Sequence, residues 1–109
     1  MAKKTDYSRV DGTSFHNVTL LTSVNKLESI LGESDYEAND GNDKVNFEWY
    51  CETKDGAPFT IYDWKQYRGI NKDEDIVFHI GSFNVLTALE AKQEIYEQLT
   101  YPEFQTKED

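Results

Sequence analysis

One short stretch of this sequence brings together side chains that suit ligand binding. Residues 61–68 read IYDWKQYR. The aromatic and cationic side chains in it are Tyr62, Trp64, Lys65, Tyr67 and Arg68. Flat rings stack on bases or other apolar groups, and neighbouring cations contact phosphate or carboxylate. Aromatic and arginine side chains are also frequent energetic centres of protein interfaces. The stretch therefore predicts a binding surface, unless its rings pack beneath a helix or loop.

His79 is the second candidate, because imidazole titrates near neutral pH and can exchange protons. It lies in a predicted strand, on the face opposite Phe78 and Ile80. Asp63 could orient it as a base, but strand alternation places Asp63 on the core side. We expect a structural, hydrogen-bonding histidine and also include His79 in the predicted binding site.

No pattern of catalytic or metal-binding residues stands out. Cys51, the single thiol, alternates with Phe47 and Trp49 on the predicted core face, where cysteine behaves as a small hydrophobe. That cysteine and two isolated histidines do not form a zinc pattern. The oxygen-rich loop 33–43 fails the calcium-loop register, because counting from Asp35 position six is Asp40 rather than glycine and position twelve is Asn46 rather than glutamate. We therefore expect no enzyme, no metal site and no cofactor.

The chain is strongly acidic, with 21 acidic and 11 basic residues among 109 and a net charge of −10. This balance disfavours direct contact with nucleic acid and favours a basic protein partner or mimicry of nucleic-acid charge. Two groups of carboxylates are candidates for such a surface, and we expect them to lie near each other. They are Asp73, Glu74 and Asp75 in one connection and Glu90, Glu94 and Glu97 on a predicted helix. An ordinary solvated surface explains the same charges.

Three segments with alternating polarity, 45–53, 59–65 and 76–81, predict the strands that position these residues. Asp55-Gly56 suits the turn between the first two. Residues 15–21 predict a further short strand or an extended lead-in. The face predicted to stay partly open carries Tyr50, Tyr62, Trp64 and His79.

Two amphipathic helices are predicted to cover the other face. The first runs from a Ser23 cap to Gly32, and the second from about Asn84 to Leu99. The apolar stripe of the second comprises Val85, Ala88, Leu89, Ile95 and Leu99, with Tyr96 at its edge. The pattern predicts one α+β domain over residues 15–101, a two-layer sandwich of a three- or four-stranded antiparallel sheet with two helices on one face. Residues 1–14 and 102–109 are predicted to be flexible.

The segments IYDWK (61–65) and FHIG (78–81), with Trp49, Asp55-Gly56 and ALEA (88–91), resemble a family of small uncharacterised proteins of tailed phages. The likeness covers roughly residues 20–100. In the family pattern a second glycine follows FHIG, whereas this chain has Ser82. The resemblance implies a viral protein in the cytoplasm of an infected bacterium and brings no established activity.

These observations predict a non-enzymatic phage accessory protein that binds a host or viral macromolecule, as an inhibitor or nucleic-acid mimic. One alternative is a protein that binds or sequesters a nucleotide-like small molecule. Another is a virion assembly component, and exposed aromatics would suit a homodimer. No apolar run is long enough to cross a membrane, so we expect no membrane association.

Overall fold

The computed structural model describes residues 1–101, so the predicted tail 102–109 lies outside the described residues. Strands and helices alternate irregularly along the chain, as in an α+β protein. In chain order they are β1 (Lys3–Lys4), α1 (Tyr7–Val10), β2 (Ser14–Thr22), α2 (Val24–Leu31), β3 (Tyr36–Glu37), β4 (Phe47–Glu52), β5 (Pro58–Asp63), β6 (Ile76–Ser82) and α3 (Val85–Thr100).

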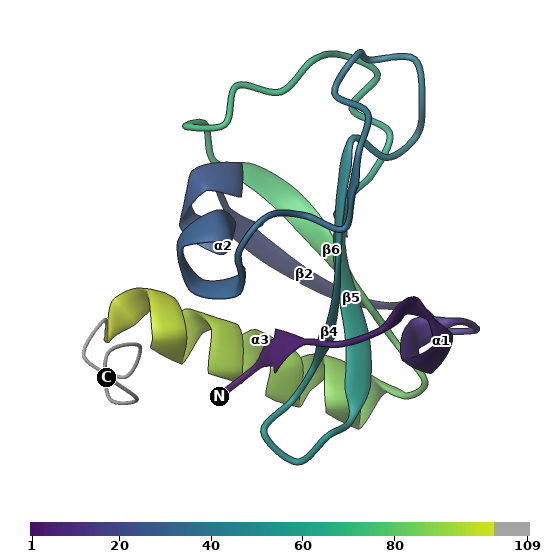
Figure 1. The fold of residues 1–109 in the computed structure, drawn as a ribbon, viewed down its shortest axis with the longest axis vertical. Coiled ribbons are helices and arrows are strands. Elements are labelled where there is room, and N and C mark those ends of the chain that lie inside the picture. Colours follow the sequence, from purple (N-terminus) through teal and green to yellow (C-terminus); the bar gives the residue numbers. More distant parts are fainter. Residues whose placement is uncertain (102–109) are drawn as a thin grey trace.

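The strands form one antiparallel sheet in the order β1-β4-β5-β6-β2, and β3 also pairs with β4. Helices α2 and α3 lie on one side of this sheet, and α1 lies on the other (Figure 1). The predicted α+β class, the antiparallel sheet and its three central strands are confirmed. The sheet has six strands rather than three or four, because the short β1 and β3 add to the edge of β4.

The core lies between the sheet and the helices α2 and α3. Alternate residues of the central strands enter it, and the sheet side chains that are fully buried there include Phe47, Trp49, Cys51, Phe59, Ile61, Phe78 and Ile80. Burying one large apolar side chain contributes about 1.5–3 kcal/mol, so this face dominates the stability of the domain. The indole N–H of Trp49 remains satisfied because it donates to the Gly32 carbonyl at 3.0 Å.

Helix α2 begins after the predicted Ser23 cap, and α3 begins after Asn84, its predicted start, which also caps it. The Ser23 hydroxyl accepts from the Lys26 N–H at 3.2 Å, and the Asn84 side chain accepts from the Thr87 N–H at 2.9 Å. Each bond satisfies a backbone donor that the first turn of a helix leaves free. Gly32 ends α2 with φ 83°, a conformation that glycine adopts without strain.

The predicted apolar stripe of α3 is partly wrong. Val85 and Leu89 are 45% and 51% exposed, whereas Ala88, Ala91 and Ile95 are fully buried. The two alanines let the helix approach the sheet closely, and this rotates the larger Val85 and Leu89 toward one flank. The face that α3 buries is therefore set by small residues.

Residues 1–14, predicted as a flexible segment before the domain, pack against it in the structure. Ala2 and Val10 are buried, and β1 pairs with β4 through Lys3 opposite Glu52. The Arg9 guanidinium donates to the Glu52 carboxylate at 2.6 Å. The segment contains little apolar surface, so backbone pairing and ion pairs hold it, and neither is visible in hydrophobic periodicity.

No helix within residues 1–101 combines the length and the apolar character needed to cross a membrane.

Candidate binding face

Four rings gather on the side of the sheet that α2 and α3 leave uncovered, and we call this cluster the aromatic face. It consists of Phe15 on β2, Tyr62 on β5, Trp64 just beyond β5 and His79 on β6. Phe15 stacks on His79 with ring centroids 3.8 Å apart and planes 10° apart. Trp64 stacks on the same imidazole at 6.0 Å, and Tyr62 meets His79 edge-on at 5.5 Å.

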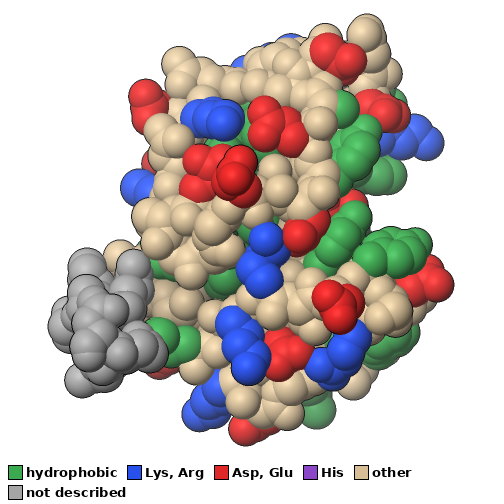
Figure 2. Space-filling model, in the orientation of Figure 1, with side chains coloured by type: hydrophobic (Ala, Val, Ile, Leu, Met, Phe, Trp, Pro, Cys, Tyr) green, Lys and Arg blue, Asp and Glu red, His purple; other side chains and the backbone are tan. Residues whose placement is uncertain are grey.

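The aromatic face is accessible. Trp64 is 38% exposed and Phe15 37%, while Tyr62 and His79 are half-buried. Exposed Leu21 and Val77, which are register partners on β2 and β6, extend the apolar surface. Figure 2 shows hydrophobic side chains gathered on the side of the molecule away from α2 and α3, whereas acidic and basic side chains are mixed over the rest of that view.

Two lysines flank Trp64. The Lys44 and Lys65 ammonium nitrogens lie 5.9 Å and 5.6 Å from the centroid of its ring. Each such cation–π contact is worth about 0.5–1 kcal/mol at an exposed site. Neither lysine forms an ion pair with any residue in the described part of the chain. In a chain of net charge −10 this is a local positive site beside an exposed indole.

A buried carboxylate fixes the strand end that carries Trp64. Asp63 is fully buried and accepts from the backbone N–H groups of Asn46 and Phe47, both at 2.8 Å, and from the Asn46 side chain at 3.0 Å. Hydrogen bonds to a charged acceptor contribute about 1.5–3 kcal/mol each. Asp63 thus anchors the residues before β4 to the end of β5 and cannot reach His79 on the other face.

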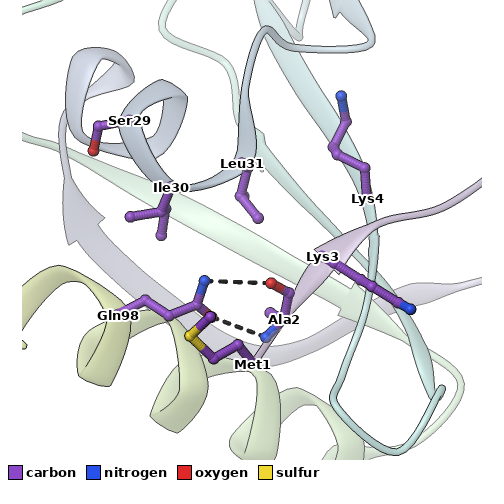
Figure 3. Close-up of a pocket in the computed structure, with 8 residues that line it drawn as sticks. All are labelled: Met1, Ala2, Lys3, Lys4, Ser29, Ile30, Leu31 and Gln98. Atoms are coloured by element: carbon purple, nitrogen blue, oxygen red, sulfur yellow. Dashed lines mark hydrogen bonds between the residues drawn. The ribbon is translucent and has the colours of Figure 1, made fainter. Parts of the chain in front are cut away.

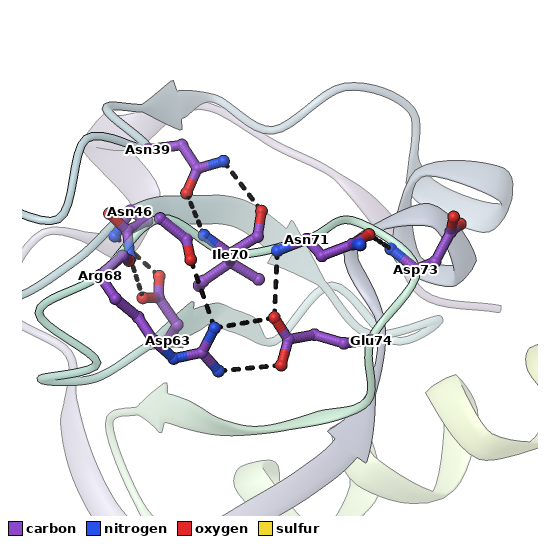
Figure 4. A network of polar contacts seen from close by, with 9 residues as sticks. Asn39, Asn46, Asp63, Arg68, Ile70, Asn71, Asp73 and Glu74 are labelled. Atoms are coloured by element: carbon purple, nitrogen blue, oxygen red, sulfur yellow. Dashed lines mark hydrogen bonds and ion pairs between the residues drawn. The ribbon is translucent and has the colours of Figure 1, made fainter.

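Further bonds tie the loops 38–46 and 64–75, which lie together at one end of the sheet (Figure 1), into one network (Figure 4). The Lys65 N–H donates to the Lys44 carbonyl at 2.7 Å. Asn39 bonds both backbone groups of Ile70, at 2.6 Å and 3.0 Å. Lys65 and Tyr67 hold φ values of 55° and 53°, a left-handed conformation that costs energy for residues other than glycine. The network therefore holds Trp64 and both lysines in a defined arrangement.

The structure brings together four of the six predicted binding residues, namely Tyr62, Trp64, Lys65 and His79. It does not bring in the other two. Tyr67 is exposed but contacts none of the four rings. The Arg68 guanidinium instead makes a bidentate pair with Glu74, at 2.8 Å and 2.9 Å.

Sequence reasoning missed Phe15 and Lys44. Alternation along 15–21 does put Phe15 on the same face as Leu21, so part of its signal was present. The pairing of β2 with β6, which brings Phe15 onto His79, follows from tertiary structure. Lys44 precedes β4 in a polar loop, where no periodicity applies.

The His79 imidazole forms no hydrogen bond with a described residue, so the expected hydrogen-bonding role is replaced by ring stacking. Burial lowers its pKa below the ordinary value of 6.5, because desolvation disfavours the imidazolium. The neutral ring therefore predominates at neutral pH, which suits stacking between Phe15 and Trp64.

The two acidic groups do not form the predicted common surface. Residues 73–75 lie beside the start of α2, where Asp73 accepts from Asn25 and Asp75 pairs with Lys26 at 3.7 Å. Glu94 of α3 accepts from the Lys54 N–H at 3.0 Å, in the turn between β4 and β5. These contacts lie at opposite ends of β5, which spans about 20 Å.

The hydrogen bond from Arg68 lowers the pKa of Glu74 to about 2.

The cysteine and the possible metal ligands add no reactive site within residues 1–101. Cys51 is buried as predicted, and burial raises the pKa of its thiol, which disfavours the reactive thiolate. No three His, Cys, Asp or Glu side chains within residues 1–101 are grouped so that they could hold a metal ion.

Two hollows lie away from the aromatic face. One, of about 430 Å³, is lined by residues of β1, α2 and α3 (Figure 3). Gln98 there bonds the Ala2 N–H at 2.9 Å and its carbonyl at 3.3 Å, and Lys4 pairs with Asp35 at 3.2 Å. The second, of about 370 Å³, lies beside Lys54 and the acidic residues of α3. The aromatic face is thus an open surface, separate from both hollows.

No model of a known protein family, no curated protein and no solved structure matches the chain. The class of the protein therefore rests on its own structure: an α+β domain with an antiparallel sheet that presents stacked rings and two flanking lysines on its uncovered side.

Proposed function

We propose that the chain is a non-enzymatic binding protein that recognises another protein through the aromatic face. The observation that carries this proposal is the exposed Trp64, which stacks on His79 in a cluster of four rings. Small-molecule sites are usually concave. An open surface with an exposed tryptophan is typical of a protein interface, where Trp side chains supply much of the binding energy.

The resemblance to tailed-phage proteins supports a role inside an infected bacterium, with a host or viral protein as the partner. Inhibition of that partner and participation in virion assembly would both use the same face. Mimicry of nucleic acid is the weaker form of the proposal. Its six carboxylates lie in two separate places, and Asp73, Glu74 and Asp75 each have a basic or amide partner.

Affinity capture with matched variants tests the proposal. Wild-type protein, Trp64→Ala and Tyr67→Ala would each be immobilised and exposed to a lysate of infected bacteria. Tyr67 is the control because it is exposed and aromatic but contacts none of the four rings. We expect a stoichiometric partner on wild type and Tyr67→Ala, and at least about 30-fold weaker binding to Trp64→Ala, as for a loss of 2 kcal/mol.

Thermal unfolding of the same variants separates binding from folding. Trp64→Ala removes a half-exposed ring, so we expect a loss of about 1 kcal/mol at most. A partner that binds Trp64→Ala as tightly as wild type would place the interface elsewhere. Unfolding of Trp64→Ala would show instead that the ring is structural.

A second candidate, nucleotide binding, is favoured by Lys44 and Lys65 alone. A base would stack on Trp64 while its phosphate meets the two ammonium groups. The test titrates AMP and GMP into Trp49→Phe, a variant in which Trp64 is the only indole. Saturable quenching that is lost in Lys44→Gln/Lys65→Gln supports this candidate, and unchanged fluorescence at millimolar nucleotide refutes it.

A further inference from the structure

The two edges of the sheet differ in whether another strand pairs with them. The β4 edge is covered, because β1 pairs with Lys3 opposite Glu52 and β3 pairs with Tyr36 opposite Glu48. The opposite edge is β2, the longest strand, and within the described residues no segment pairs with its outer side. An unpaired edge presents a row of backbone donors and acceptors to another chain.

Residues 19–22 of β2 carry none of the usual features that protect such an edge. Natural proteins commonly guard an edge strand with charged residues, proline or a bulge. Residues 14–22 read SFHNVTLLT and contain no Asp, Glu, Lys, Arg or Pro, although 29% of the chain is charged. A bulge interrupts the pairing with β6 between Phe15 and Thr19, so residues 19–22 remain a regular, unguarded strand.

A hydrogen bond shows which backbone groups face outward. The Leu21 N–H points away from β6 and donates to the Tyr96 hydroxyl at 3.4 Å, a long bond that is easily replaced. Alternate residues of a strand direct their backbone groups to the same side, so Thr19 also faces outward. If an identical strand paired antiparallel with this edge, the outward N–H and C=O groups of Thr19 in one copy would therefore lie opposite those of Leu21 in the other copy.

The surroundings of this edge are apolar. Leu21 is 57% exposed on one side, and on the other Tyr96 of α3, which is 37% exposed, reaches the Leu21 N–H. The ammonium of Lys92 lies over the Tyr96 ring at 5.8 Å. Glu90, Glu94 and Glu97 of α3 line the hollow beside Lys54, where Glu94 contacts the turn between β4 and β5. The strand β2 itself has no acidic side chain, so pairing two copies along it brings no carboxylates of the two strands together.

We infer that β2 binds a second copy of this chain. Thr19 of each copy pairs with Leu21 of the other across a two-fold axis at Leu20, and the two sheets become continuous. A two-fold axis perpendicular to a sheet keeps equivalent faces on the same side, so the dimer presents both aromatic faces together. The homodimer expected from sequence used the aromatics themselves, whereas this one leaves them free for another partner. The inference is independent of what the aromatic face binds.

Sedimentation equilibrium from about 1 µM to about 1 mM tests the dimer. Thr19→Pro removes an N–H that faces away from β6, so the pairing within the sheet is retained. We expect this variant to raise the dimer dissociation constant at least about tenfold, because it removes a donor from each copy. We expect Leu21→Glu, which adds a like charge beside the axis, to do the same.

Val77→Glu is the matched control, because Val77 is exposed on the same face, directly opposite Leu21 but one strand inside the edge. It should leave the dissociation constant unchanged. In wild type, amide exchange at Thr19 and Leu21 should slow as protein concentration rises, which keeps the test decisive if Thr19→Pro does not fold. A chain that stays monomeric overturns the inference. So does a dimer that is broken by Val77→Glu or Trp64→Ala while both edge variants leave it intact.

Discussion

Arg68 and Glu74 show how a neighbouring charge decides whether a cation takes part in a binding face. Lys65 and Arg68 are three residues apart in one loop, yet only Lys65 lies over Trp64. Glu74 holds both terminal nitrogens of Arg68, and Glu74 also accepts from the Asn71 N–H at 3.1 Å. A planar guanidinium matches the geometry of a carboxylate better than an ammonium does. Arg68, rather than Lys65, therefore pairs with Glu74.

The environment of His79 makes stability depend on pH. Burial lowers its folded pKa, whereas in the unfolded chain its pKa stays near 6.5. As the pH is lowered through about 6.5, the unfolded state takes up the proton before the folded state does. The free energy of unfolding therefore decreases as the pH is lowered, until the pH has passed below the folded pKa. We predict that urea midpoints measured from pH 8 to pH 5 fall further for wild type than for His79→Phe, which keeps a ring but cannot titrate.

An NMR titration of the His79 ring gives the folded pKa directly. A value at or above 6.5 would contradict the account, because no proton would then be taken up on unfolding. Equal pH dependence in wild type and His79→Phe would place the linkage on other groups.

At the scale of elements, most of the central fold could be predicted from the sequence. Alternation set the faces of β4, β5 and β6, and Ser23, Gly32 and Asn84 marked helix ends, because these signals act over a few residues. It also placed Tyr62, Trp64 and His79 on one uncovered face. Elements that depend on distant partners could not be read this way. The two-residue β1 exists only because β4 offers an edge to Lys3 and Lys4.

The rotation of α3 is a second feature that periodicity could not give. Leu89 is more hydrophobic than Ala88, so a hydrophobicity pattern directs Leu89 to the core. Ala88 and Ala91 instead face the core, since small residues allow the helix to approach the sheet closely. We predict that Ala91→Leu destabilises the domain by about 1–3 kcal/mol through overpacking, measured by urea unfolding.

Leu86→Ala is the matched control for Ala91→Leu, because Leu86 is 70% exposed on the same helix. Its effect should stay within about 0.5 kcal/mol. The reverse ranking, with Leu86→Ala the more costly change, would mean that the exposed flank of α3 is buried in solution.

At the scale of the whole molecule, charge opposes both folding and association. Twenty-one acidic residues give a net charge of −10, and the ion pairs are exposed or partly exposed contacts such as Lys26–Asp75, which contribute little. Raising NaCl from about 10 mM to about 150 mM shortens the screening length from about 30 Å to about 8 Å. The dominant effect is relief of self-repulsion, so we predict a higher unfolding midpoint at the higher salt concentration.

The same change of salt should tighten the β2 dimer, whose paired strands contain no carboxylate, and weaken any anion held by Lys44 and Lys65. Glu90→Gln/Glu97→Gln changes the net charge from −10 to about −8 and should flatten the salt dependence of folding. A midpoint that falls with salt would show that attractive pairs such as Arg68–Glu74 outweigh repulsion. Because the two predicted binding effects have opposite signs, one salt series separates association through the edge from anion binding at the aromatic face.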